Sequence, residues 1–350
     1  MGLIISLIVL SFLIFFHELG HFLAARFFGV KVEVFSIGFG KKLYKKVYKG
    51  TEYCLSAIPL GGYVQMKGQD DFDPLKRSND PDSYNAKSPW KRIIILFAGP
   101  LANFVIAFLL YFIIGGIGVT KFAPIIGEVM ENSPAYKAGL MKNDEIIEIN
   151  SNKIMTWDDL SVAISKSSGK LRVKIKRDGK IKSIQLTPEI KELKNIFRES
   201  EKRRVIGISP SGDTIVIKYS LAQAISYAYE ETINAGTLII KSLQKLVEGV
   251  IPAKELGGVI SIVDITAKAS SVGITALLGL AALISVNLGV LNLLPIPALD
   301  GGHIMFNLYE MITKKAPSEK VLYNLTLGGW IFLLSLMAFT IYNDIVRLAS

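Results

Sequence analysis

Four long apolar segments constrain the fold of this chain more than any other feature. Each is long enough to cross the hydrocarbon core of a bilayer as a single helix. Half of the residues are hydrophobic and the mean hydropathy is +0.40, which is too apolar for an ordinary soluble enzyme. The sequence therefore predicts a polytopic α-helical membrane protein with about four transmembrane helices, over residues 3–28, 92–119, 274–294 and 325–346.

The basic residues indicate how these helices are oriented. The net charge is +10, but it is not gathered in one helix or arm, so nucleic-acid binding is not expected. Many lysines lie in residues 29–90, and others lie between the last two apolar segments. Such charges favour the cytoplasmic side, which leaves residues 120–273 on the opposite side. The single cysteine, Cys54, excludes a disulfide framework and a cysteine metal site.

Between the first two apolar segments the pattern changes to that of short strands. The stretches VEVFSIGFG, TEYCLSAIPL and GGYVQMKG alternate and end in glycines. Residues 29–90 are therefore expected to hold a membrane-associated β-hairpin region. Residues 68–90 are polar and interrupted by prolines, which predicts a loop.

Residues 121–190 are predicted to form one inserted α+β domain. Its order of short helices, strands and a hairpin resembles a bacterial PDZ domain, which would bind peptide or protein termini between a strand edge and a helix. A small β domain without a peptide partner is the alternative. The local signals are a helix from Ser133-Pro134 to Gly139, a capping box of Thr156 with Asp159, and a hairpin turn at Asp178-Gly179.

Residues 191–273 are expected to link this domain to the third apolar segment. Within them, residues 219–250 have apolar side chains at helical spacing with polar residues between. This pattern predicts an amphipathic helix. Either a position on the outer membrane face or packing against the small domain is compatible with it.

Ionisable residues interrupt the first apolar segment in FFHELGHF, and at membrane depth such groups are costly. His17 and His21 are four residues apart, so on a helix their rings lie on one face and can hold one ion. Glu18 neighbours them and can take a proton from an attacking water. This is the zinc metalloprotease arrangement. The alternative is two histidines that only bond neighbouring helices.

A catalytic zinc needs a third protein ligand, and two candidates follow the third apolar segment in NLLPIPALDGGHIMF. Pro295 and Pro297 must break the helix there, and irregular backbone at membrane depth lies against protein or a water-filled cavity. On chemistry alone Asp300 is favoured over His303. A helix N-cap is the structural alternative for Asp300.

Several motifs together resemble the site-2 protease family of intramembrane zinc metalloproteases, in the order of its bacterial regulator-of-sigma-E branch. They are HELGH, FSIGFG, IPLGGYVQMKG, FAGPLANF, the PDZ-like domain and SVNLGVLNLLPIPALDGGH. The resemblance implies one Zn²⁺ held by His17, His21 and Asp300, with Glu18 as the general base and His303 in a supporting role. It also implies a bacterial inner membrane location, a cytoplasmic-side active site and a periplasmic PDZ domain.

The resemblance further implies residues that contact the substrate. Asn292 would bind the substrate backbone near the scissile bond, although a hydrogen bond to a neighbouring helix would also satisfy its amide. Asn103 is an expected motif residue without an assigned role. The strand region Ile58–Lys67 would pair with an unwound substrate, and the residues expected to contact it are Gly61, Gly62, Tyr63 and Val64.

The sequence thus predicts an endopeptidase that cleaves the transmembrane segment of single-span membrane proteins, such as trimmed anti-sigma factors or remnant signal peptides. Alternatives are a membrane zinc peptidase for soluble or surface peptides and a non-catalytic PDZ scaffold. Related proteins often carry two tandem PDZ domains, and this chain has room for one. The expected organisation is a catalytic membrane core in residues 1–120 and 274–350, a PDZ domain in 121–190 and an amphipathic linker in 191–273.

Overall fold

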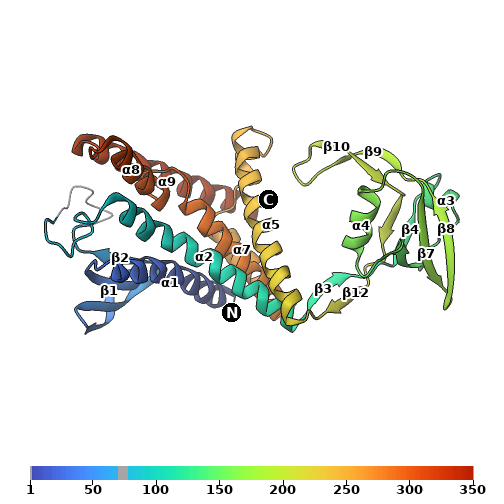
Figure 1. Ribbon diagram of the computed structural model, residues 1–350, viewed down its shortest axis with the longest axis horizontal. Coiled ribbons are helices and arrows are strands. Elements are labelled where there is room, and N and C mark those ends of the chain that lie inside the picture. Colours follow the sequence, from blue (N-terminus) through green and yellow to red (C-terminus); the bar gives the residue numbers. More distant parts are fainter. Residues whose placement is uncertain (1, 70–77, 350) are drawn as a thin grey trace. The chain divides into compact units, whose positions relative to one another are not determined.

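A computed structural model describes residues 2–69 and 78–349, and it divides the chain into two compact units (Figure 1). The membrane unit comprises Met1–Ile114 and Leu221–Ser350, and the inserted unit comprises Gly115–Ser220. Among the described residues, four helices are long and apolar enough to cross a membrane: α1 (Gly2–Phe27), α2 (Pro89–Ile117), α7 (Ile274–Asn292) and α9 (Glu319–Ala349). They correspond to the four predicted apolar segments, so the four predicted helices are confirmed and are consistent with a multi-pass membrane protein.

The described part of the membrane unit holds three further α-helices, α5 (Leu221–Val247), α6 (Val259–Val272) and α8 (Asp300–Thr313), and a short 3-10 helix, Ala253–Glu255. The helix α5 is the amphipathic helix predicted over 219–250. It packs against α7, and its Tyr227 ring lies 6.4 Å from that of Tyr111 in α2. Its buried positions are the small residues Ala224, Ala228 and Ala235, so one face of α5 rests on the membrane helices.

The first helix has a buried stripe that carries the histidine motif. Leu13, His17, His21 and Ala25 are buried at intervals of four residues, which places them on one face of α1. Close backbone approach supports this packing, because a side chain at Gly20 would collide with the Ala98 carbonyl of α2. The motif therefore points into the membrane unit.

The predicted strands after α1 form one long hairpin, β1 (Val32–Tyr48) and β2 (Thr51–Met66). Residues 34–37 of β1 pair on one side with residues 62–65 and on the other with residues 52–55. Residues 42–48 pair with residues 51–56. The hairpin is thus a small sheet in which residues 62–65 and 42–48 form opposite edges. Of the predicted loop 68–90, residues 70–77 lie outside the described part of the chain.

The inserted unit surrounds a core of aliphatic side chains that includes Ile126, Ile146, Leu160 and Val173. The predicted capping box of Thr156 and Asp159 is present. Its helices are α3 (Pro134–Lys137) and α4 (Trp157–Ser165). Its strands are β3 (Val119–Phe122), β4 (Ile126–Val129), β5 (Glu145–Ile149), β6 (Asn152–Lys153), β7 (Leu171–Arg177), β8 (Lys180–Leu186), β9 (Glu189–Lys194), β10 (Ser200–Val205), β11 (Ile208–Pro210) and β12 (Thr214–Ile217).

The boundaries of the inserted unit differ from the expected domain 121–190. One sheet has the strand order β6-β5-β7-β8, while β11 pairs with β4 and β12 pairs with β3. Residues up to 220 therefore belong to this unit and are not linker. Local periodicity could not reveal this, because each of these pairs joins strands far apart in the sequence.

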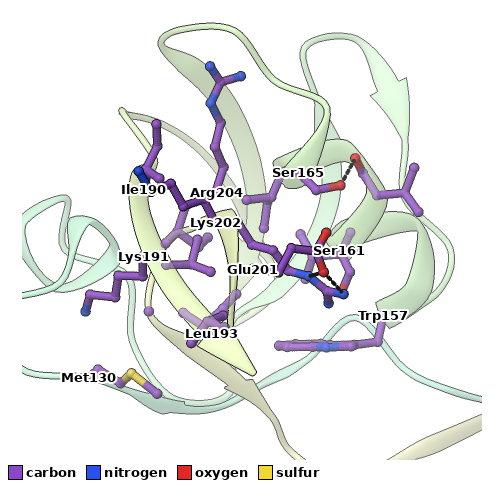
Figure 2. A pocket seen from close by; sticks show the side chains of 18 residues that line it. Met130, Trp157, Ser161, Ser165, Ile190, Lys191, Leu193, Glu201, Lys202 and Arg204 are labelled. Carbon is purple, nitrogen blue, oxygen red and sulfur yellow. Dashed lines mark hydrogen bonds and ion pairs between the residues drawn. The ribbon is translucent and has the colours of Figure 1, made fainter. Parts of the chain in front are cut away.

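A groove of about 860 Å³ crosses the inserted unit beside α4 (Figure 2). Leu160 and Ile164 of α4 contribute to one wall, and Ile206, just after β10, and Ile208, the first residue of β11, also line it. The hairpin of β9 and β10 adds charged side chains, namely Lys191, Glu201, Lys202, Arg203 and Arg204. The groove thus lies between a helix and strands.

One buried ion pair joins the start of β5 to the end of β7, and its loss should destabilise the inserted unit. Asp144 is fully buried and accepts two hydrogen bonds of 2.6 Å from Arg177 and one of 2.8 Å from the Met141 amide. We expect Asp144→Ala to reduce the free energy of unfolding of this unit by about 3 kcal/mol, because Arg177 loses its partner. Hydrogen exchange of the β5 and β7 amides in the full chain measures this.

The matched control for this variant is Lys174→Ala. Lys174 pairs with Glu148 at 2.9 Å, but both side chains are partly exposed. Its loss should cost about 0.5 kcal/mol or less. Equal effects of the two variants would contradict the assigned role of Asp144.

Candidate metal centre

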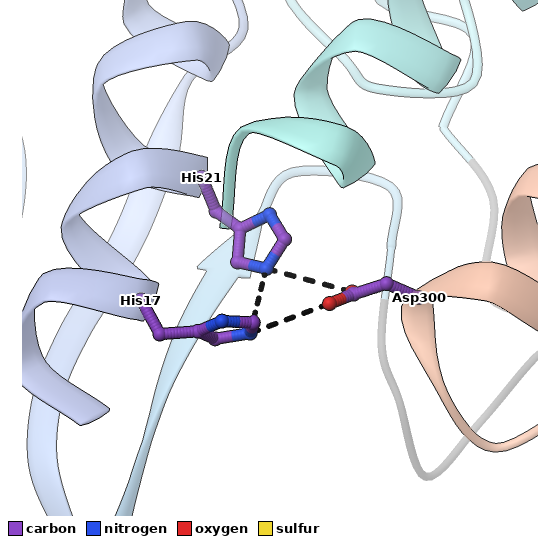
Figure 3. A group of neighbouring side chains, drawn as sticks. All are labelled: His17, His21 and Asp300. Atoms are coloured by element: carbon purple, nitrogen blue, oxygen red, sulfur yellow. Dashed lines mark hydrogen bonds and ion pairs between the residues drawn. The ribbon is translucent and has the colours of Figure 1, made fainter. Parts of the chain in front are cut away.

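Three predicted ligand side chains meet in the membrane unit, although two come from α1 and one from α8 (Figure 3). His17 Nε2 lies 3.3 Å from Asp300 Oδ2, and His21 Nε2 lies 3.5 Å from Asp300 Oδ1. The two Nε2 atoms are 3.2 Å apart. All three side chains are largely buried, with at most 16% of any exposed.

The broken segment after α7 brings Asp300 to this point. Asp300 is the first residue of α8, and the N-cap is Leu299, so the N-cap alternative for Asp300 is not what the structure has. Gly301 and Gly302 press against backbone carbonyls of the preceding irregular segment, where any side chain would collide. The two glycines thus allow α8 to start in direct contact with the backbone of this segment.

The orientation of His21 is set by α2. Its Nδ1 donates a hydrogen bond of 2.8 Å to the carbonyl of Ile95, which can only accept. The proton of the neutral ring is therefore on Nδ1, and the lone pair of Nε2 points toward His17 and Asp300. Gly99 leaves room for the ring, because a Cβ there would collide with His21 Nε2.

Asn103 of α2 holds the other histidine. Its Nδ2 lies 3.1 Å from His17 Nδ1, and its backbone carbonyl accepts a hydrogen bond of 2.8 Å from Ser285 of α7. Asn103 is fully buried, and its Oδ1 has no hydrogen-bond partner among the described residues. The amide can therefore make half a turn and present Oδ1 to His17 Nδ1 without breaking another protein hydrogen bond. The sequence had indicated Asn103 only as a motif position.

The donor set fits a bound cation. Two imidazole nitrogens and a carboxylate are zinc ligands, and their facing lone pairs repel one another unless a cation or protons lie between them. In the described part of the chain, the ligand atoms of His17, His21 and Asp300 all lie within 4.8 Å of one another. His303 is not in this group, and its ring lies 5.9 Å from that of Phe306.

A cavity of about 300 Å³ opens beside the three side chains. Glu18 and Asn292 line it, and Asn292 Nδ2 lies 3.4 Å from His17 Nε2. The edge segment of β2 also lines it through Gly61, Gly62 and Val64. A Cβ at Gly62 would come within 3.2 Å of Glu18 Cγ, so the strand passes close to the glutamate.

Tyr63 is the predicted substrate residue that does not line this cavity. Its ring stacks on that of Phe39 with an interplanar angle of 6° and a centroid distance of 6.2 Å. Phe39 itself lines the cavity, so the Tyr63 ring lies behind Phe39 rather than in the cavity wall.

Comparison with known proteins agrees with this geometry. The model of Peptidase family M50 matches residues 5–336. A Campylobacter jejuni protein named "Putative zinc metalloprotease Cj1068" is 51% identical over 343 residues, covering 98% of this chain and 93% of the relative. Proteins with the name "Putative zinc metalloprotease" in Helicobacter pylori strain J99 and, as CA_C1796, in Clostridium acetobutylicum are 42% and 37% identical, and each alignment covers at least 97% of both chains.

These matches span nearly the whole chain and confirm the resemblance, the enzyme class and the cofactor that the motifs predicted. The protein is a zinc metalloendopeptidase and belongs to peptidase family M50, the site-2 protease family.

Proposed function

We propose that this protein is an intramembrane endopeptidase that cleaves the transmembrane segment of single-span membrane proteins. The observation that carries the proposal is the cluster of His17, His21 and Asp300 in the membrane unit. The helix that carries the two histidines, α1, and the helix that orients them, α2, are both apolar enough to span a bilayer. A peptidase for soluble substrates gains nothing from placing such costly groups there. Trimmed anti-sigma factors and remnant signal peptides are the substrates that the motif resemblance suggests.

In this proposal His17, His21 and Asp300 hold the zinc ion. Zinc supplies a Lewis acid and lowers the pKa of water toward neutrality. Glu18 accepts the proton of the attacking water and later passes it to the leaving amine. Its position in the cavity wall beside Gly62 supports this role.

Asn103 keeps His17 in the tautomer that a metal ligand needs. When Asn103 Oδ1 accepts from His17 Nδ1–H, the lone pair of His17 Nε2 is free for the metal. The 3.1 Å contact and the unpartnered far end of the amide support this arrangement. Such partners of metal-bound histidines raise metal affinity by fixing ring orientation.

The substrate would lie extended between the edge segment of β2 and Asn292. A helical peptide bond is shielded by its own hydrogen bonds, whereas an extended strand can pair with a sheet edge. Residues 62–65 pair with β1 on one side, and Gly61 and Gly62 line the cavity. The Asn292 amide, also in the cavity wall, would donate to the oxygen of the scissile carbonyl as charge develops on it.

The location proposed for the enzyme is a bacterial inner membrane, with the active site toward the cytoplasmic face. The lysine-rich connection after α1 supports this orientation. The inserted unit would then lie in the periplasm as a PDZ domain. The groove between α4 and the strands supports a role in binding peptide or protein termini there.

The substitution Glu18→Gln should abolish cleavage while leaving the metal bound. Glutamine fills the same volume but cannot accept the proton, so turnover of a transmembrane reporter should fall about 10²–10⁴-fold. Elemental analysis should still find one zinc per chain. Glu131→Gln, at an exposed turn of the inserted unit, serves as the control and should cleave normally. Wild-type turnover by Glu18→Gln would refute the assignment.

The substitution Asp300→Asn should remove zinc. An amide is a poorer ligand than a carboxylate, and it leaves two histidines without the third anchor. His303→Asn should retain stoichiometric zinc, since His303 lies outside the group. The reverse result, zinc kept by Asp300→Asn and lost by His303→Asn, would assign the third ligand to His303.

Two variants at Asn103 test the tautomer argument. Asn103→Leu removes the acceptor and should weaken zinc affinity about 10–100-fold in competition with a chelator. Asn103→Asp keeps the shape, and both of its oxygens can accept from His17 Nδ1–H, so it should retain zinc. Equal affinities of the leucine and aspartate variants would leave Asn103 with a packing role only.

A reporter without a membrane span separates this function from a soluble-peptide peptidase. The wild type should cleave a reporter that carries a transmembrane helix and ignore the same cleavage sequence in a soluble carrier. Equal cleavage of both would favour the soluble-peptide alternative.

A further inference from the structure

The outer edge of the β1–β2 sheet has a composition that catalysis does not explain. Residues 41–49, KKLYKKVYK, form this edge, which we term the lysine edge. Every one of its residues is exposed. The edge lies on the side of the sheet opposite residues 62–65, which run beside the metal cavity.

The lysine edge carries a strong positive charge. Its five lysines are Lys41, Lys42, Lys45, Lys46 and Lys49. The carboxylate of Glu52, on the neighbouring strand, accepts a hydrogen bond from Lys42. This bond raises the pKa of Lys42. The other four lysines make the edge a basic surface.

Large apolar side chains alternate with these lysines. Leu43, Tyr44, Val47 and Tyr48 are each between 57% and 67% exposed. A lysine-rich edge alone would be explained as protection against pairing with another strand. That explanation does not account for the exposure of the four large apolar side chains. Lysines interleaved with tyrosines and aliphatic residues are instead typical of surfaces at the boundary of a membrane.

The sheet is tethered where the chain leaves membrane helices. The strand β1 begins at Val32, shortly after α1 ends at Phe27. The ring of Phe28 lies 5.6 Å from that of Trp90, an exposed aromatic residue at the start of α2. Aromatic residues at helix ends mark the headgroup level. The Tyr48 end of the lysine edge lies near this level, because Tyr48 pairs with Thr51 and the Thr51 hydroxyl donates to the Val32 carbonyl.

We infer that the lysine edge binds negatively charged phospholipid headgroups, and that its tyrosine and aliphatic side chains insert between these headgroups. The inference rests on the proposed membrane location. The anchored edge is three strand spacings away from residues 62–65 at the cavity. Adjacent strands lie about 4.8 Å apart, so this distance is roughly 15 Å. Anionic lipid would thus hold the sheet from one side while its other side meets substrate.

The test uses the full chain in nanodiscs of neutral phosphatidylcholine, with or without anionic phosphatidylglycerol. Hydrogen exchange of the amides of residues 42–48 should be at least about ten-fold slower with the anionic lipid. Each lysine contributes about a five-fold effect through the surface potential. Raising the salt concentration should therefore abolish the difference, because screening weakens this attraction.

A variant with Lys41, Lys45, Lys46 and Lys49 replaced by glutamine should lose the difference. The control replaces four exposed lysines of the inserted unit, Lys166, Lys170, Lys180 and Lys182, which changes the net charge equally. Exchange at residues 62–65 reports whether the sheet remains folded. If the variant unfolds, the lipid and salt dependence of the wild type still decides.

Two outcomes would overturn the inference. One is equal protection of residues 42–48 in neutral and anionic nanodiscs. The other is protection that appears only when a substrate protein is added, which would assign the edge to peptide binding. Zinc content measured on the same samples separates a failure here from a failure of the proposed catalytic function.

Discussion

Three electron-pair donors face one another at the centre of the membrane unit, and the rest of that unit serves to hold them there. His17 Nε2, His21 Nε2 and the Asp300 carboxylate repel one another at 3.2 to 3.5 Å unless positive charge lies between them. In a region shielded from water such a cluster is stable only when its members cannot move apart. A zinc ion satisfies the cluster, and hydrogen bonds from α2 hold both histidine rings in place.

Helix α2 positions both histidine ligands, although it contributes no ligand itself. It offers the Ile95 carbonyl to His21, the Asn103 amide to His17 and the empty space of Gly99 to the His21 ring. These three contacts come from successive turns of one helix, so a shift of α2 would disturb both histidines together. The third ligand depends on a different device, the start of α8 against irregular backbone at Gly301 and Gly302.

The β sheet connects this centre to the surface of the membrane unit. Its inner edge passes Glu18, and its outer edge carries lysines and exposed aromatic residues. A strand edge suits a substrate that must leave its helical form, because backbone hydrogen bonds lost from the helix are regained in the sheet. In the proposed mechanism, the two edges would therefore link substrate binding with the lipid environment of the sheet.

Apolar length, alternation and the spacing of HELGH are local signals, so the four apolar helices, the strands after the first helix and the zinc chemistry could be predicted from the sequence. Chemistry and resemblance also favoured Asp300 over His303. The folded arrangement was needed to show that Asn103 and the Ile95 carbonyl orient the histidines, that Tyr63 does not line the cavity, and that β11 and β12 join the inserted unit. These features depend on which distant segments touch, and periodicity along one segment carries no record of its partners.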